Sequence, residues 1–217
     1  MKSFFQEHKS YFLTVGTFIL ISIVFLFFIK KGDAVLFFSE NRTDNWNTFF
    51  IMVNRLGEEW TYLAGFLFLL FIKKIRHAIF VPVVGSFTMF FSYGLKALFA
   101  HQRPKMWAAS NHIFINFVPE VYVNVGYTSF PSGHTFSSFA IFGYFALVSK
   151  SPFLKVFFAI CGILGGLARI YLSQHFLEDI LFGGILGISL ATGVYYWQSQ
   201  LSNESSKWWN KSLFLNV

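Results

Sequence analysis

The sequence has few charged residues and almost no cysteine. Charged residues make up 12% of its 217 residues, about half the ~25% of an ordinary soluble domain. The single cysteine, Cys161, excludes a disulfide framework within the chain and a metal site built on several cysteines. Hydrophobic residues reach 55%, and phenylalanine alone contributes 32 residues. This composition indicates a membrane protein whose main partner is the lipid bilayer.

The net charge of +7 does not indicate a nucleic-acid-binding protein. The sequence has no basic run with interleaved aromatics outside the flanks of its apolar segments, and its positive charges cluster beside those segments. No internal repeat, low-complexity tract or second domain is visible. We therefore expect a single domain over residues 1–217, and nothing in the sequence indicates an obligate protein partner.

Six apolar segments predict an all-α integral membrane protein with six transmembrane helices. Each is close to the ~20 residues that a bilayer requires, although the second is short. The Gly165-Gly166 and Gly183-Gly184 pairs are typical of positions where membrane helices pack closely. The predicted spans are Tyr11–Ile29, Glu59–Ile72, Ala78–Phe99, Ser132–Ser149, Phe153–Leu172 and Glu178–Trp197.

Between the first two spans, the segment Ala34–Gly57 mixes polar and apolar residues. This pattern predicts a helix that lies in the membrane interface rather than crossing it. Trp46 and Trp60 fit the aromatic belt at the membrane surface. On the other side of the third span, the stretch from His101 to Pro131 is long for a loop, so we expect it to carry functional contacts.

Three short patches at the ends of the predicted spans carry charge that a membrane protein tolerates only at a cost. Such residues are usually functional. The first patch contains Lys96 and Arg103-Pro104, where two cations suit a multiply charged anion. Alone, it is equally typical of side chains that reach for lipid headgroups.

The second patch, Pro131-Ser132-Gly133-His134, opens a predicted helix. Ser132 is a good N-cap, and Gly133 lets another group approach the backbone. Free N–H groups at a helix start bind anions such as phosphate, and His134 would sit beside that anion. Alone, the patch is also compatible with a capped membrane helix that carries a histidine at the interface.

The third patch contains Arg169, His175 and Asp179. Four residues separate His175 from Asp179, so both lie on one face if they share a helix. A carboxylate on one ring nitrogen fixes the tautomer and makes the other nitrogen a better nucleophile or base. Arg169 offers a planar fork for phosphate oxygens. Alone, the patch also fits a stabilising His–Asp cap beside a snorkelling arginine.

Together, the three patches resemble the signature of the type 2 phosphatidic acid phosphatase family, also called the lipid phosphate phosphatase and vanadium haloperoxidase superfamily. That signature reads K-x6-R-P, then P-S-G-H, then S-R-x5-H-x3-D. The order and every internal spacing match in this chain, and the small chain looks like the bacterial integral membrane members. One position departs, because Ala168 stands where the family has serine, which removes one hydroxyl donor to phosphate.

The resemblance implies an enzyme that hydrolyses a phosphate ester or diphosphate of a lipid without a metal or another cofactor. His175 would be the nucleophile that forms a phosphohistidine, Asp179 would orient it, and His134 would protonate the leaving oxygen and then activate water. Undecaprenyl diphosphate is the favoured substrate, ahead of phosphatidylglycerol phosphate and the phosphates of lipid A. Phosphate would be held by Lys96, Arg103, Ser132, Gly133 and Arg169.

The distribution of lysine and arginine predicts an orientation in the inner (cytoplasmic) membrane. Of the 17 cations, eight lie on the side of the patches, and three of those eight belong to the patches. The positive-inside rule then places both termini in the cytoplasm and the site at the periplasmic or exterior face. Lys30 and Lys31 oppose this assignment. The nine cations on the predicted cytoplasmic side are Lys2, Lys9, Lys73, Lys74, Arg76, Lys150, Lys155, Lys207 and Lys211.

Two functions of other classes stay open. An anion transporter or channel would use the same charges to line a path, but transport alone needs no oriented nucleophile, and the sequence shows no clearly broken helix at mid-membrane. A catalytically silent binder is favoured only by Ala168. A haloperoxidase does not fit, because those relatives are soluble.

Overall fold

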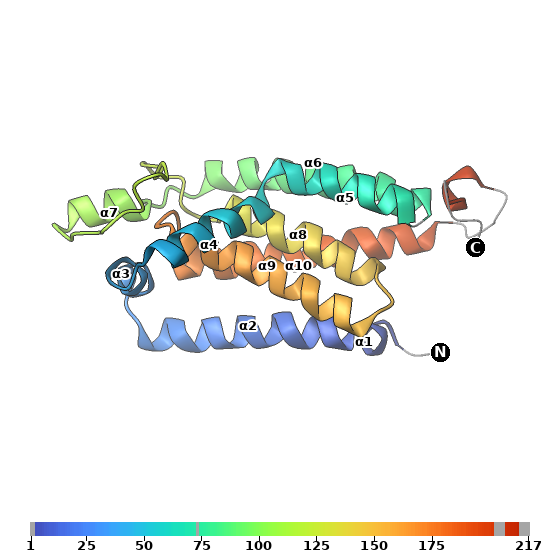
Figure 1. Ribbon diagram of the computed structural model, residues 1–217, viewed down its shortest axis with the longest axis horizontal. Helices are drawn as coiled ribbons and strands as arrows, with labels where there is room; N and C mark the ends of the chain where they lie inside the picture. The colour runs from blue at the N-terminus through green and yellow to red at the C-terminus, as the bar shows by residue number, and fades with distance from the viewer. Residues whose placement is uncertain (1–2, 73, 202–206, 213–217) are drawn as a thin grey trace.

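The computed structural model describes residues 3–72, 74–201 and 207–212, and within these ranges the chain is all-α, as predicted (Figure 1). Two isolated β-bridges, Lys74 with Ser212 and His101 with Thr128, are the only extended pairings there. The elements are α1 (Phe4–Glu7), α2 (Lys9–Phe28), α3 (Asp33–Glu40), α4 (Asp44–Asn54), η1 (Arg55–Gly57), α5 (Glu59–Ile72), α6 (Ile75–Leu98), α7 (Pro104–Ser110), α8 (Gly133–Val148), α9 (Pro152–Tyr171), α10 (Leu177–Gln200) and η2 (Trp208–Asn210).

Each of the six predicted spans corresponds to one helix of the bundle. Among the described residues, α2, α6, α9 and α10 are long and apolar enough to cross a membrane, with 20, 24, 20 and 24 residues. The apolar helices α5 and α8 are shorter, with 14 and 16 residues. The chain is therefore a multi-pass membrane protein, and the count of six crossings stays a prediction.

Helix α8 forms the centre of the bundle. All its residues from Thr135 to Val148 are buried, which its almost wholly apolar sequence permits. Glycines of α10 allow that helix to approach closely: a Cβ at Gly183 would lie 2.8 Å from the Ser132 carbonyl oxygen, and one at Gly187 would lie 2.8 Å from that of Phe136. A Cβ at Gly184 would lie 3.3 Å from the ring of Phe139 on α8, so the predicted packing role of the Gly183-Gly184 pair is confirmed.

The prediction of a single helix between the first two spans is wrong. The segment forms two helices, α3 and α4, which are followed by the short helix η1. The break lies at Asn41–Thr43, where the Thr43 hydroxyl accepts a hydrogen bond from the Trp46 backbone N–H and starts α4 afresh. In Figure 1, α3 is seen end-on, whereas α4 runs across α9. The ring of Phe50 on α4 stacks on that of Tyr171 on α9, with centroids 4.2 Å apart.

The stretch between α6 and α8 is not an unstructured loop throughout. It contains α7, which begins at Pro104, a residue well suited to the first position of a helix. Trp107 on α7 packs edge-on against Phe176, the residue that follows His175. The long connection is therefore anchored beside the third patch.

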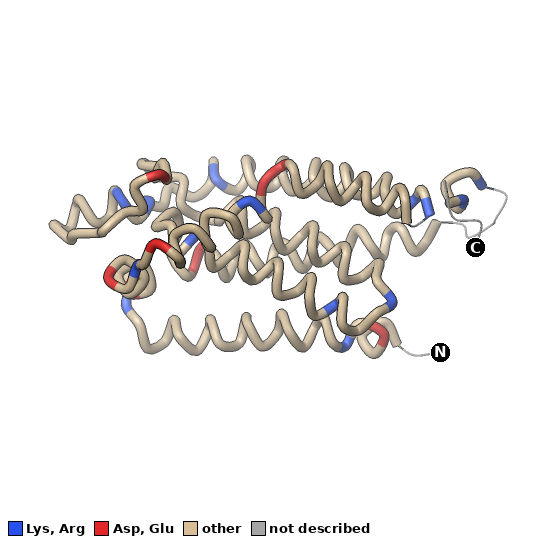
Figure 2. The backbone as a smooth tube through the Cα atoms, in the orientation of Figure 1, with Lys and Arg blue, Asp and Glu red and all other residues tan. Residues whose placement is uncertain are grey.

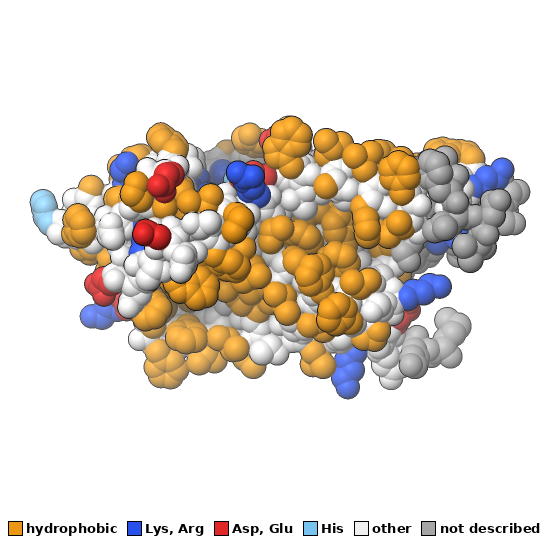
Figure 3. Space-filling view, viewed as in Figure 1, with side chains coloured by type: hydrophobic (Ala, Val, Ile, Leu, Met, Phe, Trp, Pro, Cys, Tyr) orange, Lys and Arg blue, Asp and Glu red, His pale blue; other side chains and the backbone are white. Residues whose placement is uncertain are grey.

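Most of the described charged residues lie toward the two ends of the bundle, and a few lie nearer its middle, where η1 meets α5 (Figure 2). Apolar side chains cover much of the face shown in Figure 3. Helices α1 and η2 lie at one end, and α3 and α7 lie at the other (Figure 1). Two cations counted on the predicted cytoplasmic side, Lys2 and Lys73, lie outside the described residues. This distribution suits a molecule whose middle is surrounded by lipid.

Candidate active site

The three patches meet at the end of the bundle opposite α1 and η2. Lys96 lies in the last turn of α6, and Arg103 precedes α7. Ser132 caps α8, whose first two residues are Gly133 and His134. Arg169 lies in the last turn of α9, whereas Asp179 lies in the first turn of α10. His175 stands between these two helices.

His175 and Asp179 form a buried pair. The His175 Nδ1 atom lies 3.3 Å from Asp179 Oδ2, and both residues are 1% exposed. Since a carboxylate accepts hydrogen bonds, this contact assigns the ring proton to Nδ1 and leaves Nε2 with its lone pair. The backbone N–H of Phe176 also donates to Asp179 Oδ2, at 2.9 Å. The pair has the geometry of an oriented nucleophile.

His134 is the point at which the patches converge. It interacts electrostatically with the other histidine and with the cations of the first and third patches. The set comprises His175, Lys96, Arg103 and Arg169. Arg103 and Arg169 also interact with His175, and Asp179 is the buried carboxylate beside it. This arrangement suits a multiply charged anion.

The two arginines are held by neighbours outside the patches. Arg103 Nη1 donates to the Gln174 carbonyl oxygen at 3.2 Å, and its Nε donates to Thr128 Oγ1 at 3.2 Å. Arg169 Nη1 donates to Asn54 Oδ1 on α4. Arg169 Nε is buried, and no partner for it occurs in the described part of the chain. A guanidinium donor left over in this setting is available to an anionic oxygen.

Gly133 lets the first and second patches come together. A Cβ on Gly133 would lie 2.7 Å from Ser92 Oγ and 3.4 Å from Lys96 Nζ. A larger residue would therefore press on the first patch. Ser132 is fully buried, and its hydroxyl accepts from the N–H of Thr135 at 3.3 Å, so the predicted N-cap is confirmed.

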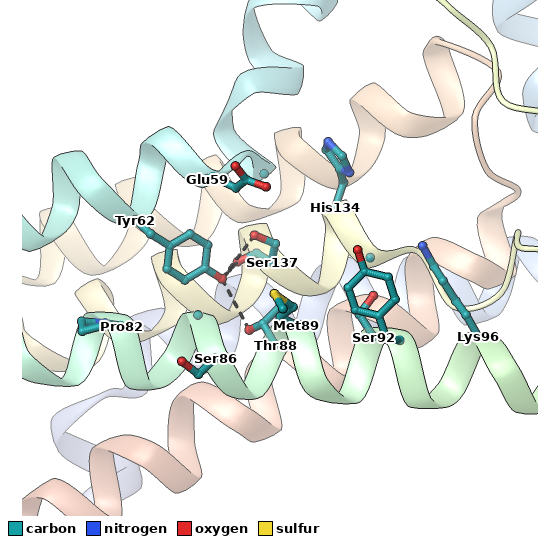
Figure 4. Close-up of a pocket in the computed structure, with 14 residues that line it drawn as sticks. Glu59, Tyr62, Pro82, Ser86, Thr88, Met89, Ser92, Lys96, His134 and Ser137 are labelled. Carbon is teal, nitrogen blue, oxygen red and sulfur yellow. Dashed lines mark hydrogen bonds between the residues drawn. The ribbon is translucent and has the colours of Figure 1, made fainter.

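The site opens into a cavity of about 500 Å³ between α5, α6 and α8. Its walls include Tyr62, Pro82 and Met89, and at one end it reaches Lys96 and His134. Figure 4 shows Lys96 rising from α6 toward the start of α8, which carries His134. Glu59 of α5 borders the same opening (Figure 4). The cavity joins an apolar groove to a cationic end, a combination that suits an amphipathic anion.

Burial shifts the acid–base behaviour of the residues outside the spans. It lowers the pKa of His175 to about 4, although Asp179 opposes that change. Burial likewise lowers the pKa of Arg103 from its ordinary value, again with Asp179 opposing. With this pKa, His175 is neutral near pH 7, and its Nε2 lone pair is free.

Ala168 is fully buried in an apolar cluster with Phe50, Val118, Tyr171 and Leu172. Ala168 therefore contributes no polar group to the site. His101, which begins the long stretch before α8, packs its ring against Phe99 and Phe130. Among the described residues, no group of three or more His, Cys, Asp or Glu side chains is arranged to hold a metal ion.

Sequence reasoning missed Asn54, Gln174 and Ser129. Asn54 lies in the segment interpreted only as interfacial, and its polar side chain was the available signal. Gln174 lies directly before His175 and accepts from both Arg103 and Asn124. Ser129 donates to Asp179 Oδ2 at 2.5 Å. Nothing in the local sequence around Ser129 indicates this contact, which joins residues 50 positions apart.

Comparison with known families decides the class of the protein. The family model of the PAP2 superfamily matches residues 77–202, which is more than half of the chain and includes all three patches. The chain belongs to the PAP2 superfamily. The resemblance carried by the three patches is thereby confirmed.

Curated relatives match parts of the chain. It is 39% identical to phosphatidylglycerophosphatase B of Bacillus subtilis over 72 residues, which cover 29% of this chain and 35% of that protein. It is 29% identical to lipid A 1-phosphatase of Rhizobium etli over 142 residues, which cover 61% of this chain and 59% of that protein. The chain thus spans about one third to three fifths of the length of these relatives.

Two crystal structures share the PAP2 fold with this chain. The structure of Aquifex aeolicus LpxE aligns with a TM-score of 0.62 and 21% identity, covering 76% of this chain and 94% of that one. The structure of a transmembrane PAP2-type phosphatidylglycerolphosphate phosphatase from Bacillus subtilis aligns with a TM-score of 0.64 and 20% identity, covering 88% and 98%. At these identities the comparison supports the fold alone.

Proposed function

We propose that the protein is a membrane lipid phosphatase that works through a phosphohistidine on His175. The observation that carries this proposal is the convergence of three cations on His134, beside His175, which is oriented by a buried carboxylate. Phosphoryl transfer requires little more from a protein than positioning and stabilisation of negative charge. Transport of an anion would not need the His175–Asp179 pair.

In the first step, His175 Nε2 attacks the phosphorus atom and the bond to the leaving oxygen breaks. His134 gives its proton to that oxygen, and Asp179 stabilises the positive charge that develops on His175 through the Nδ1–H bond. In the second step, His134 takes a proton from water, whose oxygen attacks the phosphohistidine. The phosphorus–nitrogen bond then breaks, inorganic phosphate leaves, and His175 is neutral again.

The remaining site residues are proposed to hold the phosphoryl oxygens. Lys96 contributes a mobile charge, whereas Arg103 and Arg169 contribute planar forks. Ser132 and Gly133 begin α8, and the free N–H groups at this helix start add donors at the positive end of the helix dipole. This arrangement supplies charge stabilisation from protein groups, and we propose that the reaction needs no cofactor.

A lipid substrate is supported by the cavity between α5, α6 and α8. Its apolar walls would accept a hydrocarbon chain while the phosphate lies against Lys96 and His134. The names of the curated relatives, phosphatidylglycerophosphatase B and lipid A 1-phosphatase, agree with a substrate of this class. Undecaprenyl diphosphate stays the favoured substrate, and phosphatidylglycerol phosphate and lipid A are the alternatives.

We further infer that the protein lies in the inner membrane with both termini in the cytoplasm and the site facing the periplasm or exterior. The placement of α1 and η2 at the end opposite the site supports this orientation. Reporter fusions to the two ends of the chain test it: both ends should report the cytoplasm, and a periplasmic signal from either would contradict it.

The function is tested by phosphate release from purified protein in detergent with the three lipid phosphates, beside the His175→Ala variant. Release from one lipid by the wild-type protein only would establish the reaction class and name the substrate. If folded protein released no phosphate from any of the three lipids, the proposed substrates would be contradicted, and transport or binding without catalysis would be favoured.

A further inference from the structure

The segment Gly126–Ser129 lies outside the three patches, yet it contacts two of them directly. The backbone N–H of Arg103 donates to the Gly126 carbonyl oxygen at 2.8 Å, and Arg103 Nε donates to Thr128 Oγ1 at 3.2 Å. The Ser129 backbone N–H donates to the His101 carbonyl oxygen at 3.1 Å. The Ser129 hydroxyl turns to the third patch. The segment thus links the first patch to the nucleophile pair.

The contact between Ser129 and Asp179 is the shortest one in the pair's surroundings. Ser129 Oγ lies 2.5 Å from Asp179 Oδ2, and Ser129 is fully buried. The same carboxylate oxygen accepts from Phe176 N–H and from His175 Nδ1, whereas Oδ1 is buried with no partner among the described residues. All the donors that fix this carboxylate therefore act on one oxygen.

We propose that Ser129 is a positioning residue for the nucleophile, which it orients through Asp179. This inference rests on the proposed function of His175. The backbone donor of Phe176 belongs to the same turn as His175, so it moves with that turn. Ser129 comes from a separate segment, so its hydrogen bond holds the Asp179 carboxylate in place independently of that turn.

Two consequences follow for the chemistry. Without the Ser129 hydroxyl, the carboxylate is free to turn its unpartnered oxygen toward the space left behind, which loosens the Nδ1–H bond of His175. A carboxylate that accepts fewer hydrogen bonds is also a stronger base and draws the His175 ring toward its protonated form. The first effect reduces the rate of the phosphoryl step rather than the binding of phosphate. The second raises the pH below which His175 is protonated and loses its lone pair for the attack.

The test combines Ser129→Ala with a double-mutant cycle on Asp179→Asn, assayed by phosphate release from the lipid that the wild-type protein hydrolyses. We expect Ser129→Ala to lower kcat roughly 10-fold to 100-fold, with KM changed less than about twofold, because the lost bond is charge-assisted and acts on the reacting group. In the Asp179→Asn background the same change should cost little, since its effect passes through the carboxylate. Ser189→Ala is the matched control, because the exposed Ser189 hydroxyl bonds only the Ile185 carbonyl of its own helix.

A second readout does not depend on turnover. In protein labelled on histidine, the NMR signal of the His175 ring, assigned with His175→Gln, should titrate roughly one pH unit higher in Ser129→Ala than in wild type. An unchanged titration, or equal losses of kcat in the wild-type and Asp179→Asn backgrounds, would overturn the proposal. If the wild-type protein releases no phosphate, the proposed function fails, and the NMR titration alone still decides whether Ser129 acts on the pair.

Discussion

Gly57, the last residue of η1, offers a sharp test of how the segment before α5 supports the site. A Cβ built on Gly57 would lie 2.7 Å from the His134 carbonyl oxygen and 2.9 Å from Ser138 Oγ. The first of these atoms belongs to the backbone of α8, so a rotamer change cannot relieve the contact. Ordinary contact begins at 3.4 Å, so Gly57→Ala has to move the start of α8 or η1 by about 0.7 Å.

A displacement of that size bears on a proposed reacting group, because the contact is with the backbone of His134. Misplacement by ~1 Å can cost about 100-fold in rate, so we expect Gly57→Ala to lower kcat about tenfold or more. Overpacking also destabilises a fold by about 1–3 kcal/mol. Phosphate release at saturating lipid measures the first effect, and thermal unfolding in detergent measures the second.

Gly16→Ala is the matched control, because no atom lies within 4 Å of a Cβ at that position of α2. It should keep full activity, and alanine is the better helix former of the two residues. The reasoning would be refuted if Gly57→Ala matched Gly16→Ala in both kcat and melting temperature. That result would mean that η1 does not press on the start of α8.

Four further predictions concern the site. Burial lowers the pKa of His175 to about 4. Protonation of His175 should therefore leave kcat/KM unchanged near pH 6.5 and lower it only as the pH falls toward about 4. Because the pKa of His175 is lower in the folded state than in the unfolded chain, the unfolded chain binds the proton first as the pH falls below about 6.5, and the folded state loses stability. Melting temperatures measured over a pH series, with His175→Gln as control, test whether stability falls in this direction. Arg169→Lys keeps the charge but not the fork, so kcat/KM should fall roughly 10-fold to 100-fold, and wild-type values in steady-state kinetics would refute the bidentate role. Phosphate release should survive EDTA, and loss restored by a divalent ion would contradict the metal-free mechanism.

The helices and the patches could be predicted because their signals are local. Apolar runs and capping residues mark α5 and α8 almost to the residue: the prediction of Glu59–Ile72 coincides with α5, and that of Ser132–Ser149 differs from α8 by one residue at each end. The contact between His175 and Asp179 was expected from their spacing on a shared helix face, but the structure makes it differently: His175 lies before α10, and only Asp179 lies within that helix.

The supporting contacts could not be predicted because they join distant parts of the chain. Arg42, interpreted only as an outer-side cation, donates to the Asn116 and Tyr171 carbonyl oxygens and, at 2.8 Å, to Ser173 Oγ. These partners lie 74 to 131 residues away. The break between α3 and α4 was missed for another reason. It depends on one N-cap residue, Thr43, within a segment whose mixed composition also fits a continuous helix.

The measurement that tests the central claim most directly is chemical trapping of the phosphoryl intermediate. Lipid substrate labelled with 32P on the reacting phosphate is mixed with the protein, quenched within milliseconds in alkali, where phosphohistidine survives, and mapped by peptide mass spectrometry. The account predicts label on His175, none in His175→Ala, and longer-lived label in His134→Ala, which lacks the base for the water step. Turnover without any labelled protein, or label on a residue other than His175, would contradict it.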